Sequence, residues 1–115
     1  MSSKLFKVFT VLVITCFIPN ISFSGDLILG KEIATAICST CHGIDGKATT
    51  GGNSAITPNI TAQQKDYLIA KLKDYKSGKI NHQQMSLIAQ MLSDTDIENV
   101  SEWYSSIIIS IKIPE

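Results

Sequence analysis

The chain has 115 residues, with ten lysines, no arginine and ten acidic residues, so its formal net charge at pH 7 is zero. No stretch is basic enough to neutralise a phosphate backbone, which argues against a nucleic-acid-binding protein. The length allows one small domain, whose modest apolar core would gain stability from a buried cofactor.

The first 24 residues have the layout of a secretory signal peptide. Two lysines precede an apolar run at 8–18, and a small–x–small triplet follows at 22–24. We therefore expect residues 1–24 to be cleaved, leaving 25–115 as the mature domain in the periplasm. An uncleaved membrane anchor is the alternative, although the run is short for a helix that crosses a bilayer.

Cleavage changes both the cysteine count and the charge. Cys16 would leave with the leader, so the mature chain keeps Cys38 and Cys41, with eight lysines against ten acidic residues and a net charge of −2. In an oxidising compartment, an exposed pair of thiols at this spacing tends to form a disulfide unless another group occupies the sulfurs.

The mature part predicts helices joined by loops. From Asp26, a candidate N-cap, apolar residues recur at helical spacing up to a Cys-x-x-Cys-His motif at 38–42, which closes the first helix. Residues 43–54 are rich in turn formers and have no helical or strand period. They predict a loop that is long for a small domain.

Three further helices are expected after this loop. The segment TAQQ at 61–64 has the capping-box form and predicts the start of a helix that ends at Gly78. Residues 81–84 open a short helix, and Ser93 caps the last one. The isoleucine-rich tail at 107–113 is compatible with fraying, with a short strand or with packing on a partner.

The motif itself, Cys38-x-x-Cys41-His42, allows three kinds of site. A structural zinc ion needs four ligands, and only His82 is a further conventional candidate in the mature chain. A thioredoxin-like dithiol belongs in a strand–helix–strand setting and leaves His42 without a role. Covalent haem attachment uses all three residues, because the thiols add to two vinyl groups and the imidazole binds the iron. The helical setting favours haem.

Three segments of the chain resemble class I cytochromes c, in particular the short bacterial periplasmic monohaem kind, which includes the cytochrome subunit of sulfide-oxidising flavocytochromes c. They are LGKEIATAICSTCHGIDGK, TPNITAQQKDYLIAKLKDYKSGKI and QQMSLIAQMLSDTDIENVSEWYSSI. The resemblance runs from Gly30 to Ile107 with the segments in the right order. It implies an all-α cytochrome c fold, with about four to five short helices around one covalently attached haem.

The resemblance also implies roles for individual residues. Cys38 and Cys41 would hold haem c through two thioethers, with His42 as the proximal iron ligand. The carbonyl of Pro58 would accept the hydrogen bond from the other ring nitrogen of that histidine and so fix its orientation. The remaining implied residues are apolar haem contacts at Ile60, Leu68 and Leu72, and a close crossing of the first and last helices at Gly30 and Trp103.

Met85 matches the family's sixth ligand. Its sulfur is soft and neutral, and it begins a short helix after the break at Gly78, where the chain can bring a side chain across the haem face. Met91 is expected to pack against neighbouring helices, and His82 to be solvated. In one departure from the family, Ile80 occupies the place of a frequent arginine. Lys79, beside it, is then the candidate partner of a haem propionate.

With His/Met ligation the resemblance implies a periplasmic electron carrier and not an enzyme on its own. Its partners would be redox proteins, with no nucleic acid and no stable membrane anchor. An alternative is the haem subunit of a larger oxidoreductase such as a flavocytochrome c sulfide dehydrogenase, docked on a flavoprotein subunit. Another is a haem enzyme or gas sensor with an open sixth position.

Overall fold

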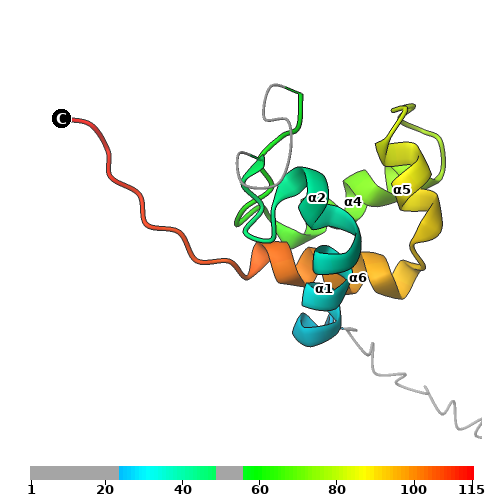
Figure 1. Cartoon of the computed structure of the whole chain (residues 1–115), viewed down its shortest axis with the longest axis horizontal. Coiled ribbons are helices and arrows are strands. Elements are labelled where there is room, and N and C mark those ends of the chain that lie inside the picture. Colours follow the sequence, from blue (N-terminus) through cyan, green and yellow to red (C-terminus); the bar gives the residue numbers. More distant parts are fainter. Residues whose placement is uncertain (1–23, 49–55) are drawn as a thin grey trace, which may run out of the picture.

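The computed structural model describes residues 24–48 and 56–115, and within these ranges the chain is helical without strands (Figure 1). The expected all-α class is therefore confirmed. The predicted leader at 1–24 falls, apart from Ser24, outside the described residues, as does part of the predicted loop. The helices are α1 (Leu27–Ile33), the π-helical segment η1 (Ala34–Cys38), α2 (Ser39–His42), α4 (Lys65–Lys76), α5 (Met85–Met91) and α6 (Asp94–Ser105).

The helix that carries the motif begins where the sequence predicts. The Asp26 side chain accepts hydrogen bonds from the backbone N–H groups of Ile28 and Leu29 at 2.8 and 3.0 Å, which caps α1. The helix continues through η1, a π-helical segment that the sequence did not predict, and ends with α2 at Gly43, whose φ is +74°. A π segment inside a helix is often associated with a functional site.

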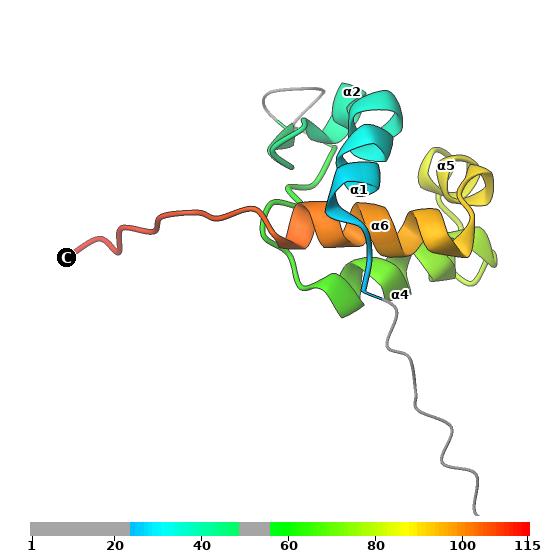
Figure 2. The ribbon, with the colours of Figure 1, turned by 90° about the horizontal axis from the view of Figure 1, so that it is seen from below.

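The first and last helices cross at Gly30 (Figure 2). A Cβ atom built on Gly30 would lie 2.0 Å from the backbone oxygen of Asn99 and 3.2 Å from Cβ of Trp103. The Asn99 side chain also accepts a 2.8 Å hydrogen bond from the backbone N–H of Asp26. The expected close crossing is therefore present, and it brings Ala34 of η1 into one buried cluster with Leu68, Val100 and Tyr104.

The predicted capping box at 61–64 is wrong. Helix α4 begins at Lys65, and its N-cap residue Gln64 makes no side-chain capping hydrogen bond. The Thr61 hydroxyl donates to the backbone oxygen of Asp45 instead, and Ala62 has a φ of +52°, which a helix cannot contain. The segment thus fastens the loop after the motif, and tertiary contact overrides the local capping signal.

A capping box does begin α6. The Ser93 hydroxyl accepts from the backbone N–H of Asp96 at 3.0 Å, and the Asp96 carboxylate accepts from the backbone N–H of Ser93 at 2.9 Å. Replacing Ser93 by Ala should lower the free energy of unfolding by about 1 kcal/mol at pH 7. Urea denaturation of the haem-loaded protein measures this difference, and an unchanged midpoint would contradict it.

The same capping box predicts that the free energy of unfolding depends on pH. Hydrogen bonds from the Ser93 side chain and backbone hold the pKa of Asp96 below its usual 3.8. This contribution to stability is fully present above the unfolded pKa and is lost as the pH falls through the lowered folded value. The difference between wild type and Ser93→Ala should therefore shrink below about pH 4.

After α6 the tail is extended and leaves the helical body (Figures 1 and 2). Its isoleucines are largely exposed, with Ile108 at 94% and Ile113 at 85%. The described tail forms no strand, and only its first residue, Ile107, packs against the core cluster of this chain. Packing of the tail on a partner stays a prediction. In the described ranges, the structure contains no helix that combines the length and apolar character needed to cross a membrane.

Candidate functional site

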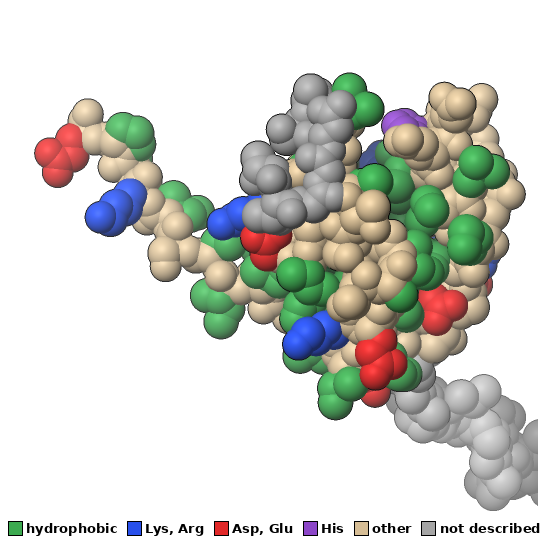
Figure 3. Space-filling view, in the orientation of Figure 1, with side chains coloured by type: hydrophobic (Ala, Val, Ile, Leu, Met, Phe, Trp, Pro, Cys, Tyr) green, Lys and Arg blue, Asp and Glu red, His purple; other side chains and the backbone are tan. Residues whose placement is uncertain are grey.

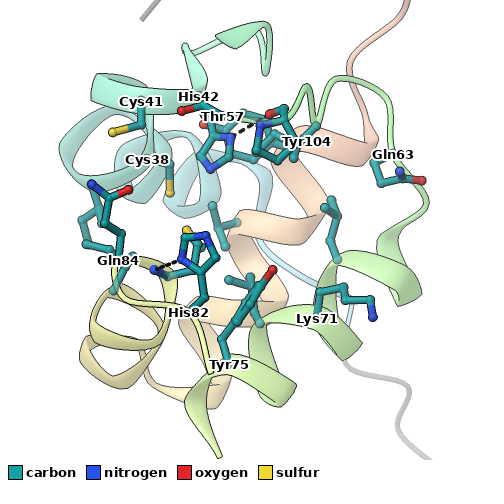
Figure 4. Close-up of a pocket in the computed structure, with 18 of the residues that line it drawn as sticks. Cys38, Cys41, His42, Thr57, Gln63, Lys71, Tyr75, His82, Gln84 and Tyr104 are labelled. Carbon is teal, nitrogen blue, oxygen red and sulfur yellow. Dashed lines mark hydrogen bonds between the residues drawn. The ribbon is translucent and has the colours of Figure 1, made fainter. Parts of the chain in front are cut away.

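A cavity of about 600 Å³ opens beside the motif (Figure 4). Its lining combines the motif and the segment at 56–60 with side chains from α4, α5 and α6. The structure brings together all eight residues that the resemblance assigned to the haem: Cys38, Cys41, His42, Pro58, Ile60, Leu68, Leu72 and Met85. Volumes of this size are usual for cofactor and small-molecule sites.

The two thiols sit one helical turn apart and are not bonded to each other. Cys41 is exposed, while Cys38 is partly buried, and this burial raises the thiol pKa of Cys38 to about 11 against the opposing effect of a hydrogen bond with Tyr104. A reactive dithiol needs a lowered pKa, so this environment argues against a redox-active pair. In the described ranges no three metal-binding side chains come together.

His42 is held in one orientation. Its side chain is buried, with 8% of its surface exposed, and Nδ1 donates to the backbone oxygen of Pro58 at 3.0 Å. This is the hydrogen bond that the resemblance implied. Because a carbonyl can only accept, Nδ1 carries the proton and Nε2 of the neutral ring keeps its lone pair for a ligand.

Two aromatic side chains of α6 fix the backbone that follows His42. The Tyr104 hydroxyl donates to the carbonyl of Gly43 at 3.0 Å, and Nε1 of Trp103 donates to the carbonyl of Ile44 at 2.9 Å. The sequence analysis placed Trp103 at the helix crossing and missed this role for both residues. Adjacent hydrogen-bonding aromatics in a helix were the only available signal, because buried Tyr and Trp usually find polar partners.

Removal of the Tyr104 hydroxyl by Tyr104→Phe should cost about 1–2 kcal/mol of stability, because the buried Gly43 carbonyl loses one of its two donors and keeps only the backbone N–H of Gly46 at 3.1 Å. Trp103→Phe should cost less than about 1 kcal/mol, since the Ile44 carbonyl lies where water can replace the indole. Urea denaturation of the two variants gives the comparison, and a larger loss in Trp103→Phe would contradict this explanation.

The sixth-ligand candidates have different surroundings. Met85 is the first residue of α5, is half-buried and lines the cavity, whereas Met91 at the other end of α5 is 69% exposed. The expectation that Met91 packs against neighbouring helices is therefore wrong. His82 is exposed as expected, but its ring also lines the cavity (Figure 4).

The polar side chains near the cavity differ in part from expectation. Lys79, the expected substitute for the family's arginine, forms an ion pair with Asp74 at 3.0 Å and does not line the cavity. Lys71 of α4 does line it and was missed by the sequence reasoning, which looked only beside Ile80.

Several known proteins to which this chain is similar are cytochromes c. The family model for cytochrome c matches residues 27–107. The chain is 37% identical over 86 residues to cytochrome c-554(548) of Halomonas halodenitrificans, covering 72% of this chain and 98% of the relative. It is 26% identical over 76 residues to the cytochrome subunit of sulfide dehydrogenase from Chlorobaculum tepidum, covering 66% of this chain and 64% of that subunit.

Cytochrome c4 provides the structural comparison. The chain is 30% identical over 83 residues to cytochrome c4 of Pseudomonas aeruginosa, covering 72% of this chain but 39% of that protein. The crystal structure of reduced recombinant cytochrome c4 from Pseudomonas stutzeri superposes with a TM-score of 0.65 at 28% identity, covering 76% of this chain and 48% of that one. The chain thus spans half or less of cytochrome c4. With the family model matching most of its length, this chain belongs to the cytochrome c family.

Proposed function

We propose that this protein is a periplasmic electron-transfer protein that carries one covalently bound haem c, with His42 and Met85 as axial ligands. The single observation that carries the proposal is the shared cavity, whose lining contains the two motif thiols, His42 and the thioether of Met85. Family membership supports the cofactor, since cytochromes c attach haem through this motif.

The residues present fit haem c. Two free thiols lie in successive turns beside the cavity, an imidazole with Nδ1 bound to the Pro58 carbonyl leaves Nε2 available as a ligand, and a thioether lines the same space. Apolar side chains from α4, among them buried Leu68 and half-buried Leu72, supply a wall of low polarity. Haem c with two axial protein ligands supplies reversible one-electron transfer and leaves no open coordination position for a substrate.

The protein's own contribution is to hold the haem and to orient the His42 ring that binds it. The Pro58 carbonyl fixes the His42 ring, and the bonds from Trp103 and Tyr104 fix the peptide groups that follow it. The apolar side chains that line the cavity exclude water. The change of charge at the iron would therefore take place in a low-dielectric environment. Such a site favours electron transfer over substrate chemistry, so we propose a carrier and not an enzyme.

The proposed partners are redox proteins that dock transiently. The described surface carries no cluster of one charge sign on the face in Figure 3, where lysines and acidic side chains are interspersed. A second role, as the haem subunit of a larger oxidoreductase, is favoured by the similarity to the sulfide dehydrogenase subunit. Residues 1–24 would act as the cleaved leader that exports the chain.

The experiment is replacement of Met85 by Ala, with Met91→Ala as the matched control, because both methionines lie in α5 and Met91 is exposed. Met85→Ala should abolish the far-red sulfur-to-iron absorption band of the oxidised protein, lower the reduction potential and allow carbon monoxide to bind. Met91→Ala should keep the band. Loss of the band in Met91→Ala alone would overturn the ligand assignment.

A further inference from the structure

Several hydrogen bonds connect His82, three residues before the start of α5, to the first residues of that helix. The backbone N–H of Met85 donates to Nδ1 of His82 at 3.2 Å, and the backbone N–H of His82 donates to the Ser86 hydroxyl at 3.0 Å. The backbone N–H of Ser86 donates to the carbonyl of His82 at 2.9 Å, and its hydroxyl donates to the carbonyl of Ile80 at 3.3 Å. His82 is therefore fixed through its backbone as well as its ring.

We propose that His82 is a positioning residue for Met85: its imidazole caps α5 and sets where the thioether enters the cavity. The inference rests on the proposed function, in which Met85 is an axial ligand. The first N–H groups of a helix have no partner within it, and the N-cap residue Gln84 provides no side-chain acceptor here. The His82 ring supplies that acceptor for Met85 itself.

The ring is also held from outside the loop. His82 packs edge-on against Tyr75 of α4, with the ring centroids 5.9 Å apart and the planes at 70° (Figure 4). This contact links α4, which lines the cavity, to the start of α5. Aromatic pairs in this arrangement contribute beyond their buried area. Displacement of the Met85 backbone from the cavity wall would break the cap or pull the His82 ring away from Tyr75.

The hydrogen bond from the Met85 N–H to Nδ1 of His82 also decides which of the two residues can bind iron. An imidazole whose Nδ1 accepts an N–H carries its proton on Nε2 when neutral, and a protonated nitrogen cannot bind iron. The cap and iron ligation by Nε2 of His82 thus exclude each other. The geometry assigns His82 to the support of Met85, although its ring lines the same cavity.

The test measures how readily imidazole displaces the sixth ligand in the oxidised, haem-loaded protein, because displacement requires Met85 to leave the iron. His82→Ala removes the acceptor, and His82→Asn keeps a side-chain oxygen that can cap. Gln83→Ala is the control, since Gln83 is exposed in the same loop. Imidazole should bind about fivefold more tightly to His82→Ala, and within about twofold of wild type to His82→Asn and Gln83→Ala.

Equal affinities in His82→Ala and Gln83→Ala would overturn the positioning role while leaving the ligand assignment intact. An imidazole affinity of His82→Asn that differs from the wild-type value as much as that of His82→Ala does would also overturn the positioning role. The capping acceptor would then not be what keeps Met85 in place. The ligand assignment fails separately if Met85→Ala keeps the far-red band. A wild-type protein that lacks this band, together with carbon monoxide binding in His82→Ala, would make His82 the ligand and overturn both.

Discussion

Replacing Cys38 and Cys41 together by Ala should leave a chain without covalent haem that is largely unfolded. The cavity that these residues line, about 600 Å³, is large for a small domain and is also lined by side chains from α4, α5 and α6. Of the eight buried apolar residues in the described ranges, three are alanines, and the larger ones except Ile97 line the cavity: Leu68, Leu92, Val100 and Tyr104. Without haem these walls face water, and so small a domain has few other sources of stability.

Haem staining on a denaturing gel and far-ultraviolet circular dichroism measure the two parts of this result. Ser39→Ala is the matched control, because Ser39 lies between the cysteines and its hydroxyl donates only to the carbonyl of Thr35 one turn earlier. The control should keep haem and helix content. A double-alanine protein with native helix content and a cooperative melting transition would show that the fold does not depend on haem.

Gly30→Ala should destabilise the protein by about 3 kcal/mol, since the new methyl group collides with the backbone of α6. Its Cβ would lie 2.0 Å from the Asn99 carbonyl oxygen and 2.7 Å from the carbonyl carbon, and neither atom can move as a flexible side chain would. The two helices must separate. Because they carry the motif and the aromatic pair that fixes it, separation also loosens the His42 segment.

Gly78→Ala is the comparison that isolates this collision. Gly78 has a φ of +78°, and a Cβ built there meets no atom within 4 Å. That variant should lose only about 1 kcal/mol, the cost of a left-handed conformation for a residue with a side chain. Urea denaturation of both haem-loaded variants gives the difference, and equal losses would show that crowding at the crossing is not what requires glycine.

Much of this fold follows from local signals in the sequence. Asp26 and Ser93 cap the helices that their positions predict, and Met85 begins a short helix after the break at Gly78. These features depend on side chains and backbone groups within a few residues of each other. For the same reason, the Cys-x-x-Cys-His spacing in a helix predicted a cofactor site without knowledge of the fold.

The parts that could not be predicted depend on partners far along the chain. Thr61 satisfies the carbonyl of Asp45 and not a helix end, and the indole and hydroxyl of Trp103 and Tyr104 reach the loop after His42, about sixty residues away. Met91 shows the opposite case. Its helical spacing suggested packing, but its side chain is 69% exposed, while Ala89 and Leu92 at the same end of the helix are buried.

The most direct test of the electron-carrier proposal is a spectroelectrochemical titration of the exported wild-type protein, with carbon monoxide added to the reduced form. The account predicts covalently bound haem, a reversible one-electron transition, a far-red band in the oxidised state and a reduced spectrum that carbon monoxide does not change. A reduced protein that binds carbon monoxide at once, or an oxidised one without the far-red band, would contradict His42/Met85 ligation and the carrier role that depends on it.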